Sequence, residues 1–177
     1  MMSLPGGPTK DEVMAVVFQK LGLLKSDVFI DIGCGTGKIS INAAPLVKWV
    51  YGVDMRIEAV NHASDLAAGE GIGNAEFVCE DAGDFLEKMD SVDAAFVGGS
   101  KDLTRVLSIL AKKHTRAIVV NAVLIETVNK AISEMKGLGI YGEAILVSVS
   151  RAHPLGQGTM FRPLDPVYII SGGCREC

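Results

Sequence analysis

Short apolar runs alternate with helical patterns along this chain of 177 residues. Runs rich in β-branched residues predict seven strands, at 28–32, 49–54, 75–79, 92–97, 117–121, 144–150 and 167–171. Apolar residues at helical spacing predict helices at 37–44, 57–68, 101–110 and 124–135. A regular alternation of strands and helices is typical of an α/β fold with a mostly parallel sheet.

The two ends of the chain depart from this alternation. Residues 151–166 carry no helical pattern, so we predict a loop there and an antiparallel hairpin of the last two strands. A predicted helix at 10–21 follows Thr9-Lys10-Asp11-Glu12, which has the spelling of a capping box. No repeat or low-complexity linker interrupts the chain, which predicts a single domain over 1–177 with an N-terminal segment, 1–22, that folds over a ligand as a lid.

The composition and the apolar runs lead to an expectation about where in the cell the protein is located. Hydrophobic residues make up 49% of the chain, which fits a sheet covered on both faces and a subunit interface. No apolar run approaches the roughly 18 residues that a membrane span needs, and the N-terminus lacks the apolar core of a signal peptide. We therefore expect a cytoplasmic protein with no membrane partner. The net charge of −4 gives no general attraction to nucleic acid.

A glycine-rich turn follows the first predicted strand, with the spelling Asp31-x-Gly33-x-Gly35-x-Gly37. Open α/β sheets bind ligands at such turns. A P-loop would need Ser or Thr after Lys38, where Ile39 stands, and a dinucleotide fingerprint would need a glycine at position 38. The spelling resembles the first motif of the Rossmann-like class I methyltransferases that use S-adenosyl-L-methionine, although a tight turn alone also favours glycine.

This resemblance implies roles for residues at three successive strand ends. Residues Gly33, Cys34, Gly35, Thr36 and Gly37 would approach the methionine part of the cofactor, with Asp31 near its ammonium group. Asp54 would accept the ribose hydroxyls, and Asp81 with the backbone N–H of Ala82 would hold the adenine edge. Asp54 is also compatible with a solvated strand-end acid, and Asp81 with a helix N-cap or turn residue.

The fourth strand runs into Gly98-Gly99-Ser100, where the methyl acceptor is expected to bind. Amino-methyltransferases that flip bases usually carry an Asn/Asp-Pro-Pro-aromatic clamp here, and this chain has none. Two glycines favour the approach of a large flat ligand to the backbone, or only a tight turn. We see no carboxylate-rich pattern for a catalytic metal, so we expect none.

Three further stretches resemble the CbiT family, the cobalt-precorrin-6B C15-methyltransferases (decarboxylating), or precorrin-8w decarboxylases, of corrin biosynthesis. They are Gly7-Pro8-Thr9, Val97-Gly98-Gly99-Ser100 and Gly158-Thr159-Met160, and the resemblance covers nearly the whole chain. It implies methylation of C15 of a cobalt-precorrin and loss of carbon dioxide from a ring acetate. It also places cofactor contacts on Thr9, although Thr9 with Glu12 is equally suited to capping a helix.

A tetrapyrrole with acetate and propionate arms needs cations to bind them. Arg151 and Arg162 flank the final loop, and Gln157 with Thr159 forms either a substrate loop or a simple turn. His153 is the candidate for proton delivery because its reference pKa lies near neutrality, although a single histidine after a strand is more often structural. We interpret Lys101 and Arg105 as ordinary solvated charges.

Other interpretations stay open. A tRNA base methyltransferase shares this fold, but the acidic balance of the chain counts against it; a non-catalytic S-adenosylmethionine-binding regulator is the third possibility. We expect a homo-oligomer, a tetramer, with the last hairpin as interface. Cys34 and Cys79 are predicted to be buried, and Cys174 with Cys177 supplies only half of a zinc site, so a frayed tail is favoured there.

Overall fold

A computed structural model of the chain describes residues 9–99 and 101–174. Ser100 and the expected lid residues Gly6, Gly7 and Pro8 lie outside the described residues, as does Cys177. The strands are β1 (Val28–Ile32), β2 (Trp49–Asp54), β3 (Ala75–Cys79), β4 (Ala94–Val97), β5 (Ala117–Ala122), β6 (Tyr141–Val147), β7 (Ser150–Leu155), β8 (Gly158–Pro163) and β9 (Val167–Gly172). The helices are α1 (Asp11–Leu21), α2 (Lys38–Ala43), α3 (Ile57–Gly69), α4 (Ala82–Lys88), α5 (Leu103–Lys112) and α6 (Ile125–Gly137), with a 3₁₀ turn η1 (Ala44–Leu46).

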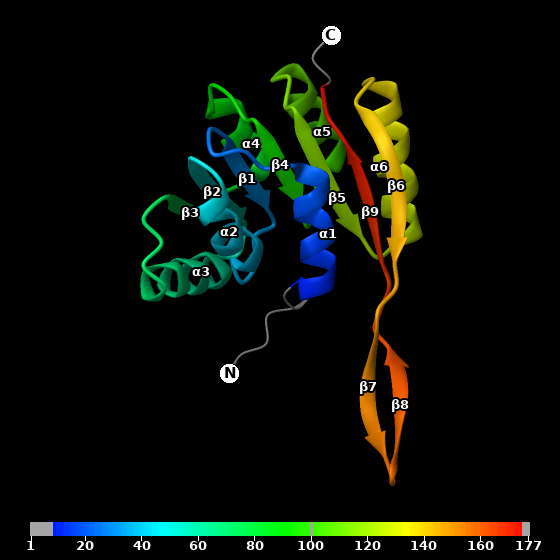
Figure 1. Ribbon diagram of the computed structural model, residues 1–177. Coiled ribbons are helices and arrows are strands. Elements are labelled where there is room, and N and C mark those ends of the chain that lie inside the picture. Colours follow the sequence, from blue (N-terminus) through cyan, green and yellow to red (C-terminus); the bar gives the residue numbers. More distant parts are fainter. Residues whose placement is uncertain (1–8, 100, 175–177) are drawn as a thin grey trace.

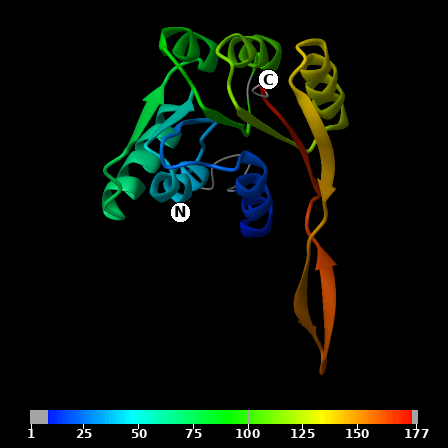
Figure 2. The ribbon, with the colours of Figure 1, turned by 45° about the horizontal axis from the view of Figure 1, so that its top comes forward.

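Seven of these strands form one sheet in the order β3-β2-β1-β4-β5-β9-β6. Strands β1 to β5 run parallel to their neighbours, and β9 is antiparallel to both β5 and β6. The predicted fold class, a mostly parallel seven-stranded sheet with a C-terminal antiparallel hairpin, is therefore confirmed. Figures 1 and 2 show α1, α2 and α3 on one face of the sheet and α4, α5 and α6 on the other.

Each face of the sheet carries its own apolar core. Because successive side chains of a strand point to opposite faces, Ile118 and Val120 pack under α4, α5 and α6, whereas Val119 packs under α1 and α2. All three side chains have at most 1% of their surface exposed. A strand buried on both faces reads as a continuous apolar run, which is why apolar runs located the central strands well.

Two local predictions at helix starts need correction. Helix α4 was not predicted; it begins after Asp81, whose carboxylate caps it by accepting the N–H groups of Gly83 and Asp84 at 2.9 and 3.2 Å. The capping box at Thr9 is wrong, because α1 has Lys10 as its N-cap and no side-chain cap bond. The Glu12 carboxylate binds Arg151 instead.

The predicted loop over 151–166 is also wrong. Strands β7 and β8 pair in register from Ser150 opposite Pro163 to Leu155 opposite Gly158, and they form a two-stranded ribbon that projects from the sheet below β6 and β9 (Figures 1 and 2). We call this ribbon the arm. The alternation of strand residues was missed because most arm side chains are exposed, so no buried face imposes an apolar period.

The prediction that Cys79 is buried is wrong, because this residue at the end of β3 is exposed.

None of the helices in residues 9–99 and 101–174 has the length and apolar character that a bilayer crossing requires. Cys174 packs against the core beneath α5, where its thiol lies 3.6 Å from the carbonyl oxygen of Ala111. No cluster of three His, Cys, Asp or Glu side chains suited to a metal occurs within those same ranges.

Candidate functional site

A cavity of about 730 Å³ opens where the carboxyl ends of the parallel strands meet. Its walls include most of the positions expected to contact a cofactor: Thr9, Asp31, Gly33, Cys34, Gly35, Thr36, Asp54, Asp81 and Ala82. Gly98 and Gly99 also line it. We call the walls in or next to β1, β2 and β3 the acidic half, and the walls in or next to α1, β4, β5 and β9 the apolar half.

The glycines of the first turn meet two separate demands. Gly33, Gly35 and Gly37 all have positive φ, at 74°, 54° and 77°. A Cβ atom on Gly33 would lie 2.6 Å from the carbonyl oxygen of Gly99, so the turn after β1 touches the turn after β4. Gly37 does not line the cavity; a Cβ there would lie 2.7 Å from the Cβ of Ala63 on α3, so this glycine serves packing between elements.

Asp31 is a buried carboxyl group at the end of β1 with one oxygen unused. Its Oδ2 accepts from the N–H and hydroxyl groups of Ser40 at 3.1 and 2.6 Å, while Oδ1 has no hydrogen-bond partner among the described residues. Burial raises the pKa of Asp31 to about 7, against the opposing effect of the Ser40 bonds and with a further contribution from the charge of Asp54. A buried acceptor without a donor is costly, so this oxygen is suited to a donor on a ligand.

Asp54 is 6% exposed and lies in the wall at the end of β2. Its carboxylate accepts the backbone N–H groups of Gly35 and Arg56, each at 3.0 Å. The Arg56 guanidinium also binds it, with Nε 2.9 Å from Oδ1 and Nη2 2.8 Å from Oδ2. Burial alone would raise the pKa of Asp54, but the bonds from Arg56 and Gly35 hold it below its usual value.

Asp81 both lines the cavity and caps the start of α4. Besides capping α4, its Oδ1 lies 3.4 Å from Nη1 of Arg105. Ala82 is the first residue of α4 and its side chain is buried. The capping role and the ligand role of Asp81 are thus compatible, because the residue whose carboxylate caps α4 also lines the cavity.

The apolar half contains residues that sequence reasoning missed. Its walls include Lys10, Val13, Phe96, Asn121, Val123 and Val167. The Oδ1 atom of Asn121 is buried and has no hydrogen-bond partner in the part of the chain that the structure describes. A signal was present in the sequence, since Asn121 is the single polar residue that interrupts the apolar run 117–125 at the carboxyl edge of the sheet.

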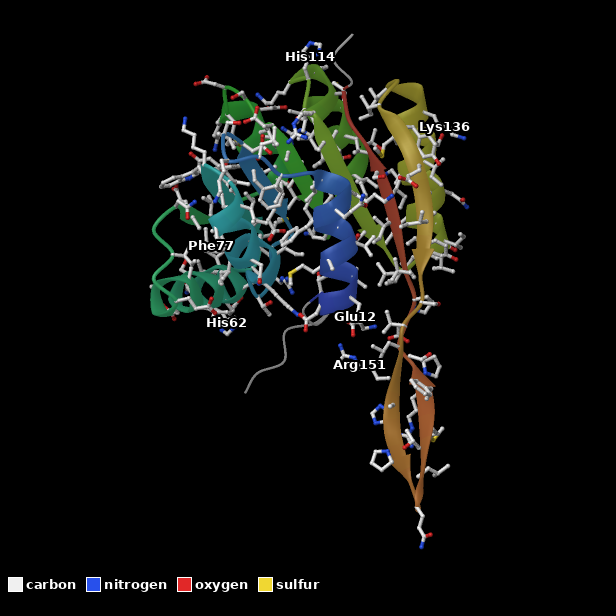
Figure 3. The ribbon with its side chains drawn as sticks, in the orientation of Figure 1. Glu12, His62, Phe77, His114, Lys136 and Arg151 are labelled. Atoms are coloured by element: carbon white, nitrogen blue, oxygen red, sulfur yellow. The ribbon has the colours of Figure 1, made fainter. Side chains whose placement is uncertain are left out.

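The arm holds the remaining candidates. Arg151, His153, Gln157, Thr159 and Arg162 all belong to β7, β8 or the turn between them, and none lines the cavity of its own chain. Arg151 points back to α1, where Nη2 lies 2.9 and 3.1 Å from the two carboxylate oxygens of Glu12 (Figure 3). The structure therefore groups these five residues with one another rather than with the cavity.

The sheet order and the placement of the acids define a class of protein. A glycine turn after β1 and acids at the ends of β1 and β2, in a seven-stranded sheet whose last inserted strand is antiparallel, belong to the Rossmann-like class I methyltransferase fold. Solved methyltransferases at low identity share this fold; an O-methyltransferase from Thermotoga maritima is 16% identical with a TM-score of 0.72.

The chain belongs to the family described as precorrin methyltransferase domain, which matches residues 4–172. It is 46% identical to a Methanosarcina acetivorans protein named "Probable cobalt-precorrin-6B C(15)-methyltransferase (decarboxylating)", over 97% of this chain and 96% of that protein.

Two solved structures are also similar. Precorrin 8w decarboxylase of Methanobacterium thermoautotrophicum has a TM-score of 0.91 at 32% identity, covering 98% of this chain and 96% of that one. Precorrin-6y C5,15-methyltransferase of Geobacter metallireducens has a TM-score of 0.89 at 28% identity, covering 97% and 94%. The resemblance expected from the sequence motifs is therefore confirmed.

Proposed function

We propose that this chain uses S-adenosylmethionine to methylate C15 of cobalt-precorrin-6B and releases carbon dioxide from a ring acetate. One observation carries the proposal: the acids at the ends of β1, β2 and β3 line one cavity beside the glycine turn, in a chain 46% identical over almost its full length to a relative with that name. The cavity continues into the apolar half, where Val13, Phe96, Val123 and Val167 are suited to a flat macrocycle.

The acidic half fits the cofactor residue by residue. The Oδ1 of Asp31, which accepts no hydrogen bond from the described part of the chain, is suited to the ammonium group, and Asp54 to the two ribose hydroxyls. Asp81 and the N–H of Ala82 are suited to the adenine edge, and Thr9 also lines the cavity. A side chain at Gly33 would collide with Gly99, so this wall position requires glycine.

The proposed methyl transfer depends more on alignment of the reacting atoms than on a strong acid or base. When bound, the cofactor supplies an electrophilic methyl group on a sulfonium. An enamine-like ring carbon of the tetrapyrrole is already nucleophilic, so the walls contribute mainly by alignment, worth roughly 7–11 kcal/mol in favourable cases. In the decarboxylation the C–CO₂ electron pair passes into the macrocycle and a proton then replaces the carboxylate, a step favoured when the apolar walls exclude water.

The arm has a place in this proposal as a contact between copies. Leu155 and Phe161 on the arm are 61% and 69% exposed, and a two-stranded ribbon is only marginally stable alone in water. We propose that the arms pack together in a homo-oligomer, a tetramer, and that Arg151, Gln157, Thr159 and Arg162 then bind the carboxylate arms of a substrate, with His153 as proton donor. Light scattering that finds a monomer at low micromolar concentration would contradict this arrangement.

An anaerobic incubation tests the reaction itself. Purified protein, isotopically labelled S-adenosylmethionine and a cobalt-precorrin-6B pool are analysed by mass spectrometry. We expect a product heavier by one labelled methyl group and lighter by one carbon dioxide. Methyl gain without loss of carbon dioxide would assign the decarboxylation to another protein, and an unchanged pool despite calorimetric binding of the cofactor would overturn the proposal.

A further inference from the structure

The Asp54 carboxylate is already fully occupied by groups of its own chain. Each oxygen accepts two hydrogen bonds, one from the backbone and one from the Arg56 guanidinium. The backbone donors, Gly35 and Arg56, fix the carboxylate in the wall of the cavity. The guanidinium bonds are the only ones of the four that come from a mobile side chain.

The Arg56 guanidinium binds the Asp54 carboxylate with the two-donor geometry expected of a ribose. Nε and Nη2 give one bond to each carboxylate oxygen, at 2.9 and 2.8 Å, which is the side-by-side geometry that two neighbouring hydroxyl groups of a ribose also offer. Arg56 itself lines the cavity, and a Cβ atom on Gly35 would lie 3.8 Å from its Nη2. The side chain thus lies over the glycine turn, in the space that a nucleoside bound to Asp54 needs.

We infer that Arg56 occupies the ribose position of the cofactor-free site and leaves it when the cofactor binds, so that this side chain lowers cofactor affinity. The inference rests on the proposed cofactor role of Asp54. A buried carboxylate beside the carboxyl group of Asp31 needs a counter-ion when no ligand is present, and Arg56 supplies it. The Arg56 side chain is 41% exposed, so it can move into solvent without crossing the core.

Because the cofactor and its product differ in charge, replacement of Arg56 should change their affinities by different amounts. S-adenosylmethionine carries a sulfonium and so has one positive charge more than its product, S-adenosylhomocysteine. Removing the guanidinium leaves the Asp54 carboxylate without its cationic partner, which favours a cationic ligand over a neutral one. Replacement of Arg56 should therefore tighten S-adenosylmethionine more than S-adenosylhomocysteine.

Calorimetric titration of both compounds into the wild-type protein and its variants tests the inference at fixed ionic strength. In Arg56→Ala we expect the Kd to fall about tenfold for S-adenosylmethionine and about threefold for S-adenosylhomocysteine, since the backbone donors that hold Asp54 remain. Arg56→Lys keeps the charge without the two-pronged donor and should fall between wild type and Arg56→Ala. Arg116→Ala is the matched control.

The control removes a comparable ion pair at the amino ends of β1 and β5, away from the cavity. Arg116 Nη2 lies 2.6 Å from Asp27, and the side chains are 36% and 3% exposed, against 41% and 6% for Arg56 and Asp54. Its cofactor affinities should equal those of wild type. In an Asp54→Asn background, where Arg56 has lost its anionic partner, Arg56→Ala should no longer tighten binding.

The outcomes separate this inference from the proposed function. Unchanged or weaker binding by Arg56→Ala, with normal binding by wild type, would overturn the role of Arg56 and leave the methyltransferase proposal intact. An equal tightening in Arg116→Ala would also overturn it, because the effect would then be general. Failure of the wild-type protein to bind either compound would overturn both proposals.

Discussion

The acidic half of the cavity and the arm are stabilised in opposite ways. In the acidic half, Asp31 and Asp81 accept backbone hydrogen bonds from residues at most nine positions away, and Asp54 accepts from Arg56 and from Gly35 in the glycine turn, so neighbouring turns determine the local geometry. In the arm, two exposed strands pair with each other, and its contact with the body includes the pair of Arg151 with Glu12 on α1. The first region is complete within one chain, whereas the second presents apolar and basic side chains outward.

The largest expected effect tests how strongly the acidic half depends on burial. The pKa of Asp31 is raised from 3.8 in the unfolded chain to about 7, so the folded protein binds more protons than the unfolded chain between these values. Stability therefore falls as pH rises from about 4 to 7, by up to about 4 kcal/mol from this group, and is flat above. Urea unfolding of wild type and Asp31→Asn across pH 4 to 8 should show this slope only in wild type.

The next effect separates close approach from backbone conformation. Gly33 and Gly139 have nearly equal φ, 74° and 71°, but a Cβ atom on Gly139 would meet nothing within 4 Å. We expect Gly139→Ala to cost about 1 kcal/mol of stability, and Gly33→Ala to cost about 3 kcal/mol because the methyl group also collides with Gly99. Equal losses in denaturant unfolding would show that the contact between the turns relaxes freely.

A smaller effect is expected in the apolar half. Asn121→Ala removes the carboxamide whose oxygen has no partner among residues 9–99 and 101–174, and we expect the KM for the tetrapyrrole to rise about tenfold with an unchanged Kd for S-adenosylmethionine. Asn61→Ala, an exposed position on α3, is the control and should change neither value. A rise in the cofactor Kd for Asn121→Ala would instead place this side chain with the acidic half.

The smallest effect on cofactor binding should come from the largest deletion. The N–H of Leu164 donates to the carbonyl oxygen of Val149 at 2.8 Å, so residues 150–163 can be replaced by Asn-Gly at a base that is already paired. We expect less than a twofold change in the Kd for S-adenosylmethionine, together with loss of self-association and of turnover. Persistence of the oligomer in light scattering would remove the arm from the interface.

The same contrast explains what the sequence could predict. The central strands and the acids at their ends follow from apolar runs and their terminal residues, so the fold and the residues gathered at one edge were accessible. Helix α4 was missed because its buried residues, Ala82, Gly83 and Leu86, include only one large apolar side chain, so the stretch shows no clear apolar period. Asn121 and Lys10 were missed as wall residues because they reach the cavity only through packing of distant segments, and the Arg56 contact depends on a side-chain rotamer that no spacing encodes.

The contact between Gly33 and Gly99 has a consequence for redesign. One turn is expected to face the cofactor and the other the methyl acceptor, yet 2.6 Å separates the carbonyl of Gly99 from the place of a Cβ atom on Gly33. Libraries that vary residues 98–99 to change acceptor specificity will therefore also shift the turn that holds the cofactor. New specificities should be sought first at Asn121 and Val123, whose replacement leaves that contact untouched.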